Sequence, residues 1–596
     1  MKKLALVLAV VMVLSLGLTA CGGSTSSTGT ASSAPAGSSS SGSASDAAPA
    51  YNPDALQVKA LDDNTLQVTL TARTPYFLEL TAFPAYAPVQ QATVEANGEA
   101  WAVDAATYIG NGPYKIAEWV PSSHITMVKN ENYWNVDSLA GPDTLQFTLM
   151  EDDAAQLTAF QSGELDFIDA VPNDEIDTLS STPEYYKEGQ IGTYYVSYNV
   201  EAAPFDDPLV RQAFTLAVDR DYICKQIGKS GQIPAGAFVS EGLSDAAEGS
   251  SFREVGGDYY DPTAGANEAN LAKAKELLAE AGYPSGEGLP TITYLYNEGT
   301  AHQQIGEALQ QMWGQLGATV TLESQEWATF LNTRKNGDYQ VARNGWLGDY
   351  NDPISFLDMW ITGGGNNDAQ WSNAEFDSLI KQIKSSGDAE ARMEMMHQAE
   401  DIIFDEWMLC PIYYYVDIYM AQQNLENLST SPLGFKFFMN ASNGTDTLKV
   451  CTGPDPDTID PALNSAVDGG TMIDHAFEGL YTVAYGTTPT PGQAESVEIS
   501  EDGLTYTFHL REGLKWSDGT PLTAHDFVYS WQRAVDPATG ADYAYMFECI
   551  AGYTEAINGE EYVAPAADAS SASTSESAAE SVSASTSESA STSAAA

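Results

Sequence analysis

The side chains that most often perform catalysis do not stand at catalytic spacings in this sequence. Its six histidines are scattered, with neither the His-Glu-x-x-His pattern of zinc hydrolases nor the Gly-x-Ser-x-Gly turn of serine hydrolases. Asp455-Pro-Asp-Thr-Ile-Asp460 has the carboxylates of a calcium loop, but it contains a proline and lacks the required glycine and terminal glutamate. These patterns argue against an enzyme, such as a cell-wall hydrolase on a stalk, and predict no metal or other cofactor.

The first cysteine has a different setting. Residues 1–3 include two lysines, and the almost wholly apolar run from Leu4 to Leu18 is too short to span a membrane but typical of a secretory signal. The run ends in Leu18-Thr19-Ala20-Cys21, which resembles a bacterial lipobox, whose cysteine is acylated and becomes the mature N-terminus. We therefore expect a lipoprotein signal peptide over residues 1–21, with Cys21 as the lipidation site. The alternative is an ordinary signal peptide with a chance cysteine.

Composition limits the partners of the chain. A formal net charge of −57 argues against nucleic acid and against an anionic lipid surface. No second apolar run of spanning length follows the signal, so we expect the membrane to be contacted through a lipid anchor only. The four remaining cysteines are scattered and fit no zinc site, although one disulfide is possible (Cys224, Cys410, Cys451 and Cys549).

Two tracts of low complexity flank a large globular middle. Residues 22–50 are rich in Gly, Ser, Ala and Thr, and residues 563–596 are mostly Ser and Ala. Neither can bury enough apolar surface to fold, so we expect a disordered tether and a disordered tail. The segment between them contains most of the 31 tyrosines, 20 phenylalanines and 11 tryptophans, and its length predicts two or three domains.

Apolar periodicity in the middle alternates between strand and helix. Thr291–Tyr296 is rich in strand-forming residues, Ile305–Leu316 carries apolar residues on one helical face, and Ala318–Leu322 is the next expected strand. Strand, helix and strand in this order indicate an α/β sheet with parallel strands. Gln57–Leu70 and Leu504–Leu510 instead alternate in the way of antiparallel strands.

Several phrases resemble one protein family. Thr507-Phe-His-Leu-Arg-Glu-Gly-Leu-Lys-Trp-Ser-Asp-Gly-Thr-Pro521, followed by Thr523-Ala-His-Asp-Phe-Val-Tyr-Ser-Trp-Gln-Arg533, is similar to the signature segment of the oligopeptide-binding proteins, the family 5 extracellular solute-binding proteins. The resemblance extends from Gln57 to Tyr562. Other matching phrases are Asn111-Gly-Pro-Tyr-Lys115, Lys129-Asn-Glu-Asn-Tyr-Trp134, Ala203-Pro-Phe-Asp-Asp-Pro-Leu-Val-Arg211 and Glu326-Trp-Ala-Thr-Phe-Leu-Asn-Thr-Arg334.

The order of these phrases differs from that of the family. In typical members the segment resembling 448–562 comes first, whereas here it follows the segment that resembles the family's C-terminus. We interpret the chain as circularly permuted, with the family's ends joined through residues 440–446 and new ends near Asp54 and Asn558. Permutation is tolerated where the old ends lie close together and the new ends fall in an exposed loop. The alternative is a gene-assembly error or a truncated fusion.

The resemblance implies an α/β fold of the two-lobed, periplasmic-binding-protein-like type II, circularly permuted, with an additional small domain. In this chain, residues 51–90 with 478–562 would form the small side domain, 91–238 with 411–477 lobe 1, and 239–410 lobe 2. If the chain is permuted, strands near 413–420 and 448–451 share one lobe, Tyr543 faces the cleft near Asp349, and Asp54 meets Asn558.

The resemblance also implies a peptide site. Asp349 matches the carboxylate that receives the peptide's α-ammonium, since a desolvated ammonium needs a charged partner. Three residues match positions that receive the peptide's carboxylate end or line its pockets, and three match the aromatic walls. The first set is Arg343, Arg334 and His302, and the second is Trp327, Trp346 and Tyr543.

Without the family, these residues have plainer interpretations. Asp349-Tyr-Asn-Asp-Pro353 would indicate an Asx turn, the basic residues a charged surface and the aromatics a core. Position along the chain favours a crevice, because His302 follows the strand ending at Tyr296, and residues 346–349 lie beyond the strand-like 339–343. In α/β folds, ligands bind outside the carboxyl ends of strands.

The function implied is that of the substrate-binding lipoprotein of an ABC importer, which captures oligopeptides and delivers them to permease subunits. It would be a monomer anchored at the extracytoplasmic face of the bacterial cell membrane, in the periplasm if the cell has two membranes. Relatives bind other solutes, so a nickel complex, an oligosaccharide or a signalling peptide stays open as ligand. A non-transporting cell-surface peptide receptor is the other alternative.

Overall fold

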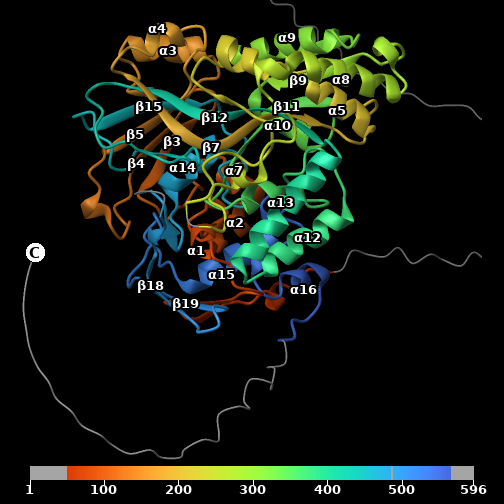
Figure 1. Ribbon diagram of the computed structural model, residues 1–596. Coiled ribbons are helices and arrows are strands. Elements are labelled where there is room, and N and C mark those ends of the chain that lie inside the picture. Colours follow the sequence, from red (N-terminus) through yellow and green to blue (C-terminus); the bar gives the residue numbers. More distant parts are fainter. Residues whose placement is uncertain (1–49, 248, 485–487, 565–596) are drawn as a thin grey trace, which may run out of the picture. The chain divides into compact units, whose positions relative to one another are not determined.

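The structure is a computed structural model that describes residues 50–247, 249–484 and 488–564 (Figure 1). The expected signal peptide, Cys21, and all but the inner edges of the expected tether and tail lie outside the described residues. Within the described ranges, no helix has the length and apolarity to cross a membrane. The same ranges contain no group of His, Cys, Asp and Glu side chains placed to hold a metal ion.

A mixed sheet with the strand order β10-β9-β11-β7-β12-β6-β15-β5-β4-β3 organises the chain. The pairs β9–β10, β9–β11, β5–β15 and β6–β15 are parallel, while β7 and β12 run antiparallel to their neighbours. Its strands are β3 (Tyr114–Val120), β4 (His124–Lys129), β5 (Thr144–Leu149), β6 (Phe167–Ile168), β7 (Tyr185–Tyr198), β9 (Ile292–Asn297), β10 (Val320–Gln325), β11 (Val341–Leu347), β12 (Leu409–Ala421) and β15 (Thr447–Gly453), with β8 (Ile233–Pro234) paired to β12.

The predicted strand–helix–strand unit is confirmed. Helix α9 (Thr300–Gly314) connects β9 to β10, which pair in parallel with Ile292 opposite Val320. Leu309 and Trp313 are fully buried on the predicted face of the helix. Gly317, at φ +88°, allows the chain to turn from the helix into β10. The mixed α/β class expected from periodicity is therefore the class observed.

Two long strands link the halves of the large sheet. The first part of β12 pairs with the end of β7 next to β11, and its later part pairs with the start of β7 and then with β6. The register shifts between Tyr414 and Val416, so that β12 bends at Tyr415. The strand group β9–β11 and the group β15–β3 are thus joined through β7 and β12.

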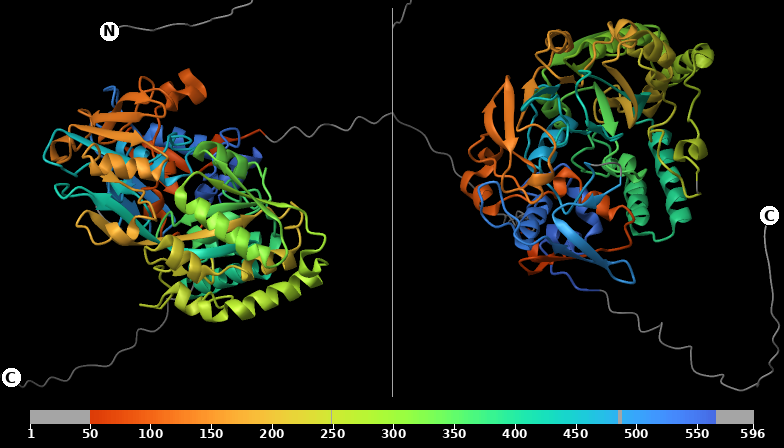
Figure 2. Two further views of the ribbon diagram at one scale, coloured as in Figure 1. Left: turned by 90° about the horizontal axis from the view of Figure 1, so that it is seen from above. Right: turned by 90° about the vertical axis from the view of Figure 1, so that its left-hand side faces the viewer.

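A second sheet joins the two ends of the described chain. Its order is β1 (Val58–Asp62), β2 (Thr65–Thr69), β19 (Thr505–Leu510) and β18 (Ala494–Ile499), all antiparallel, as the alternating pattern predicted. Figure 1 and Figure 2 show the red early strands beside the blue late ones. The chain therefore buries segments more than 400 residues apart against each other.

The remaining helices cover these sheets. A capping box begins α15, in which Thr523 and Asp526 satisfy each other's backbone N–H groups, and Trp531 of this helix is fully buried. Besides α9, the helices are α1 (Phe77–Leu80), α2 (Gln91–Asn97), α3 (Asp153–Gln161), α4 (Ile176–Leu179), α5 (Pro208–Leu216), α6 (Arg220–Tyr222), α7 (Phe252–Gly256), α8 (Asn267–Glu280), α10 (Trp327–Lys335), α11 (Ile354–Leu357), α12 (Ala374–Ser385), α13 (Ala389–Asp405), α14 (Val467–Ala476), α15 (Ala524–Val535) and α16 (Tyr553–Asn558).

Two further expectations concern chain ends and cysteines. The backbone N–H of Asn52 donates to the carbonyl oxygen of Ala556 at 2.9 Å, which places the exposed Asp54 and Asn558 near each other.

The sequence left open whether two of its cysteines form a disulfide. In the structure four cysteines are buried and none of them is in a disulfide (Cys224, Cys410, Cys451 and Cys549).

Candidate ligand-binding site

A cavity of 420 Å³ opens at the carboxyl ends of the parallel strands. The last residue of β9 (Asn297), of β11 (Leu347) and of β15 (Gly453) each line it, as do Glu151 and Ala170 just beyond β5 and β6. This is the edge at which α/β folds bind ligands, because strand ends and the loops after them converge there. The volume is in the range of small-molecule sites.

All seven residues predicted for the ligand line this one cavity: Asp349, Arg343, Arg334, His302, Trp346, Trp327 and Tyr543. Tyr543 lies 194 residues from Asp349 in sequence and hydrogen-bonds to it. One local expectation was wrong. Trp346 lies inside β11 and not beyond the strand, because the strand continues to Leu347, where it pairs with Gly192 of β7.

Asp349 is a buried carboxylate held by neutral donors. The Tyr543 hydroxyl donates to Oδ1 at 2.8 Å, and the Ser355 hydroxyl donates to Oδ2 at 3.1 Å. The Asp349 backbone N–H in turn donates to Ser355 Oγ at 2.8 Å, which fixes the loop. Burial raises the pKa of Asp349 well above its usual range, and the nearby charge of Asp358 raises it further. Within the described part of the chain, Asp349 forms no ion pair.

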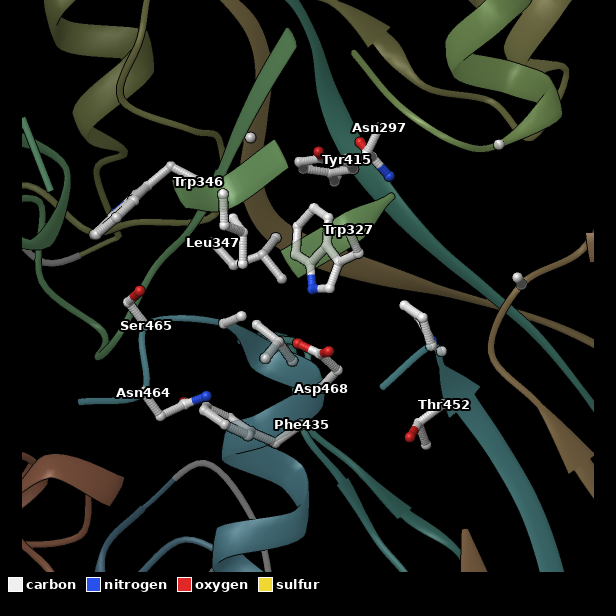
Figure 3. Close-up of a pocket in the computed structure, with 18 of the residues that line it drawn as sticks. Asn297, Trp327, Trp346, Leu347, Tyr415, Phe435, Thr452, Asn464, Ser465 and Asp468 are labelled. Atoms are coloured by element: carbon white, nitrogen blue, oxygen red, sulfur yellow. The ribbon is translucent and has the colours of Figure 1, made fainter. Parts of the chain in front are cut away.

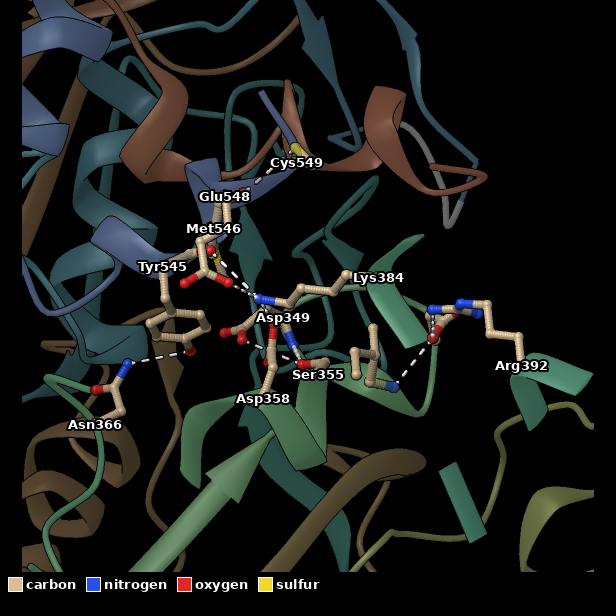
Figure 4. Close-up of polar contacts among 12 residues, drawn as sticks. Asp349, Ser355, Asp358, Asn366, Lys384, Arg392, Tyr545, Met546, Glu548 and Cys549 are labelled. Atoms are coloured by element: carbon tan, nitrogen blue, oxygen red, sulfur yellow. Dashed lines mark hydrogen bonds and ion pairs between the residues drawn. The ribbon is translucent and has the colours of Figure 1, made fainter. Parts of the chain in front are cut away.

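The cations near Asp349 are already neutralised (Figure 4). Lys384 Nζ lies 3.1 Å from both Asp358 and Glu548, and Arg392 forms a bidentate pair with Asp352 at 2.7 and 2.8 Å. Buried cations with such partners are structural. Asp349 is thus left as an unneutralised acid facing the cavity, which suits a cationic group brought by a ligand.

Arg343, within β11, is the opposite case, a buried cation without a counter-ion among the described residues. Its guanidinium carbon lies 5.3 Å from the ring centre of Tyr194 and 5.8 Å from that of Trp327. Nε is buried without a hydrogen-bond partner, and no carboxylate of the described residues pairs with this arginine. His302, whose Nδ1 lies 3.2 Å from the Tyr194 hydroxyl, has its pKa lowered by burial and by Arg343, so its ring is neutral. Arg343 is therefore available to an anionic group.

Arg334 also lines the cavity, but its charge is neutralised within the chain. Its Nε donates to Asp368 Oδ2 at 2.6 Å, and the Asn344 side chain donates to the same oxygen at 3.3 Å. Its guanidinium also lies 5.0 Å from the ring centre of Phe330. The sequence-based role for Arg334 stays a prediction, and the geometry favours a part in holding the cavity wall.

Several lining residues were not predicted. Five buried oxygens of the lining have no hydrogen-bond partner among the described residues, and neither does the Trp327 indole N–H; the oxygens are on Asn297 (Oδ1), Glu151 (Oε1), Gln156 (Oε1), Thr452 (Oγ1) and Asp468 (Oδ2). Figure 3 shows Asn297, Thr452 and Asp468 around the opening, with the Asp468 carboxylate directed toward Trp327. Buried polar groups are normally satisfied, so unsatisfied ones in a cavity mark contacts left for a ligand.

The arrangement favours an extended ligand with opposite charges at its ends. Arg343 and Asp349 are six residues apart along β11 and the loop after it, which corresponds to at most about 20 Å of extended chain. Between them, Gly345 and Leu347 line the cavity without adding charge. Trp346 and Tyr543 form the wall near Asp349, where their ring centres are 6.3 Å apart.

Comparison with known proteins agrees with this geometry. The chain matches the family model described as bacterial extracellular solute-binding proteins, family 5 middle, over residues 27–368 and 488–586. The dipeptide-binding protein DppE of Bacillus subtilis (strain 168) is 37% identical over 384 residues, covering 64% of this chain and 69% of that protein. The oligopeptide-binding protein OppA of the same strain is 36% identical over 400 residues, covering 65% of this chain and 71% of that protein.

A solved structure shares the fold. It is described as an oligopeptide ABC transporter from Bacillus anthracis str. Ames (substrate-binding domain), with a TM-score of 0.59 at 26% identity, and the match covers 65% of this chain and 74% of that chain. Since the family model matches well over half of the sequence, the chain belongs to the family 5 bacterial extracellular solute-binding proteins, which bind solutes in a two-lobed α/β fold.

Proposed function

We propose that this protein captures oligopeptides outside the cytoplasm and delivers them to the permease of an ABC importer. The observation that carries the proposal is the pair of unneutralised charges in one cavity, the Asp349 carboxylate and the Arg343 guanidinium. The two Bacillus subtilis relatives are named for binding dipeptides and oligopeptides, and the Bacillus anthracis structure is described as part of an oligopeptide ABC transporter.

In the proposed complex, Asp349 receives the α-ammonium of the peptide and Arg343 its carboxylate. Both partners are removed from water, where charge-assisted hydrogen bonds contribute about 1.5–3 kcal/mol. Peptide backbone groups would pair with the unsatisfied polar atoms of the walls, in the manner of an added strand. Side chains would occupy the remaining, water-filled volume, so that capture does not depend on one sequence.

The charges also separate this proposal from its alternatives. An uncharged oligosaccharide would leave Asp349 and Arg343 desolvated and without partners, which is costly. A nickel complex of a carboxylate chelator would suit Arg343 but need not bring an ammonium to Asp349. A signalling peptide or a non-transporting receptor shares the same site chemistry, so only ligand identity and transport distinguish them. The family is one of binding proteins, which agrees with the expectation that the chain is not an enzyme.

Native mass spectrometry of the purified protein tests the proposal directly. We expect co-purified masses that fragment as peptides of a few residues and disappear after denaturation and refolding. Calorimetry of the emptied protein should then show binding of unmodified tripeptides. A co-purified sugar or metal complex, with no response to tripeptides, would contradict the proposal.

Membrane attachment through Cys21 is a separate part of the proposal, supported by the Leu18-Thr19-Ala20-Cys21 pattern. In cells, the parent protein should partition into the detergent phase and carry acyl chains, detectable by mass. Cys21→Ala should be released or retain its signal peptide. Equal partitioning of the two proteins would contradict lipid anchoring through Cys21.

We also propose that the chain order is a circular permutation of the family order. Linear alignments cover only about 70% of each relative, yet β15 and β19 of the late segment complete sheets formed by earlier strands. The domain boundaries expected from the sequence form part of this proposal.

A rearranged chain tests the permutation. It would begin at residue 447, join residue 562 to residue 51 by a short linker and end at residue 440. The hydrogen bond between Asn52 and Ala556 shows how close that junction is. We expect the rearranged protein to unfold within a few degrees of the parent and to bind the same peptides. A rearranged chain that does not fold would count against the proposal.

A further inference from the structure

A second chamber adjoins the ligand cavity. It has a volume of 270 Å³, large beside the ~30 Å³ that one water occupies in the liquid. The residues that line both chambers are Gln190, Leu347, Thr452, Val467 and Asp468. Asp468 and Thr452 thus stand where the two volumes meet, within reach of a ligand in the first chamber.

The second chamber is acidic. Lys436 is 2% exposed, and its Nζ lies 2.9 Å from Asp417 and 3.4 Å from Asp169. Burial opposes the charge on Lys436, but these two carboxylates raise the pKa of the lysine above its usual value. One ammonium thus faces two carboxylates within the chamber, and Asp468 adds a third at the opening.

Asp468 neither caps its helix nor forms an ion pair within the described part of the chain. It stands in the first turn of α14, but the N-terminus of this helix has no side-chain cap hydrogen bond. Its Oδ2 is buried and forms no hydrogen bond or ion pair of ordinary length with the described residues, although the indole N–H of Trp327 lies nearby. Burial raises the pKa of Asp468 to about 6, opposed by the backbone N–H of Gly469 and by the nearby indole N–H of Trp327, so the group is ionised at neutral pH.

A second observation points to a donor-bearing ligand in the first chamber. Asn297 is 9% exposed and lines the first chamber, and its Oδ1 has no hydrogen-bond partner, while its Nδ2 donates to the carbonyl oxygen of Glu298 at 3.1 Å. Thr452 Oγ1, between the chambers, also lacks a partner. Three buried oxygens, on Asp468, Asn297 and Thr452, are therefore open to N–H groups.

The charges of the first chamber do not balance after a peptide's termini are placed. Asp349 would be neutralised by the ammonium and Arg343 by the carboxylate, while Arg334 is already paired with Asp368. Four acidic residues of the lining then have no opposite charge among the described residues: Glu151, Asp153, Glu298 and Asp468. A ligand that brings additional positive charge relieves this excess.

We propose that the site selects peptides with a lysine or arginine side chain, and that Asp468 is the specificity-determining residue that receives this side chain at the opening of the second chamber. The inference rests on the proposed function and specifies which class of peptide the site prefers. The alkyl part of the side chain would lie against Leu347 and Val467, and the cationic end would reach the carboxylate.

Calorimetry at low salt with six variants of one tripeptide tests the inference. Lysine is placed at each position of trialanine in turn, and each peptide is compared with the one carrying norleucine, a neutral chain of similar length, at the same place. We expect at least one lysine peptide to bind the parent protein tenfold or more tightly than its norleucine match. In Asp468→Asn, an isosteric change, that ratio should fall below threefold.

The control is Asp474→Asn, which removes a carboxylate from the same helix but lines neither chamber. It should keep the full lysine preference. If norleucine and lysine peptides bind the parent alike, or if Asp468→Asn keeps the preference, the inference fails while the proposed function stands. If no tripeptide binds the parent at all, the proposed function fails and the inference fails with it.

Discussion

Two arginines in one cavity wall differ in how their charges are satisfied. Arg334 and Arg343 are nine residues apart, both line the cavity, and both lie near aromatic rings. Arg334 donates to Asp368 at 2.6 Å, whereas Arg343 has no ion pair among the described residues and a buried Nε without a partner. The two arginines have the same side chain and line the same cavity. A comparison of their variants therefore measures the effect of a counter-ion supplied by the chain.

The acidic residues near the site also differ in whether the chain supplies a counter-ion. Asp352 and Asp358 are paired with Arg392 and Lys384, while Asp349 has only hydroxyl donors. A buried charge that the chain neutralises itself contributes to the fold, and one that it leaves open can be neutralised by a ligand. This distinction predicts that mutations in one wall divide cleanly into stability effects and binding effects.

The largest expected effect is on stability, at Arg334. Arg334→Met keeps the alkyl bulk but leaves Asp368 buried without its cation, and breaking such a pair costs about 3–5 kcal/mol. Denaturant unfolding should show this loss. Adding Asp368→Asn to the variant should restore part of it, because no charge is then left unpaired. A stable single variant with impaired binding would instead assign Arg334 to the ligand.

Arg343→Met is the matched change and should affect binding. Since the guanidinium has no internal counter-ion, its removal should leave the free energy of unfolding unchanged or raise it. Affinity for peptides with a free carboxylate should fall about ten- to a hundredfold, the equivalent of one charge-assisted interaction. Peptide amides should bind the parent and the variant equally, as calorimetry would report. Equal losses for both peptide classes would contradict the role.

A smaller effect is expected in the proton balance of binding. Burial raises the pKa of Asp349, and an incoming ammonium lowers it again, so binding expels the proton that the empty site carries where it is protonated. Calorimetry in two buffers of different ionisation enthalpy should show release of a fraction of one proton, declining as the pH rises. Asp349→Asn should release none. Proton uptake by the parent on binding would contradict this sign.

Local patterns were sufficient for parts of the fold. The face of α9 and the alternation of β19 follow from residue periodicity, because burial on one side imposes it. The course of β12 was beyond such patterns, since its bend at Tyr415 depends on pairing with β7, β6 and β8. Trp346 was placed beyond its strand for the same reason, as the strand end is set by the neighbouring chain.

The site was partly predictable because a family resemblance identified Asp349 and six neighbours. Nothing local singled out Asp468 or Asn297, which matter through unsatisfied oxygens that only the folded chain defines. Likewise, no pattern could show that Arg334 is neutralised by Asp368, 34 residues away. Residue types indicate which charges are present, but partner distances decide which of them stay open to a ligand.

The central claim is that the Asp349 carboxylate is the partner of the peptide's ammonium, and one calorimetric comparison tests it. The parent protein and Asp349→Asn are each titrated with a tripeptide and with its N-acetylated form. Acetylation should weaken binding to the parent by two orders of magnitude or more, since it leaves a buried charge unpaired at a cost of about 3–5 kcal/mol. For Asp349→Asn the two peptides should bind with similar, weak affinity, and unfolding should show that the fold is intact. Free and acetylated peptides binding equally to the parent would contradict the account.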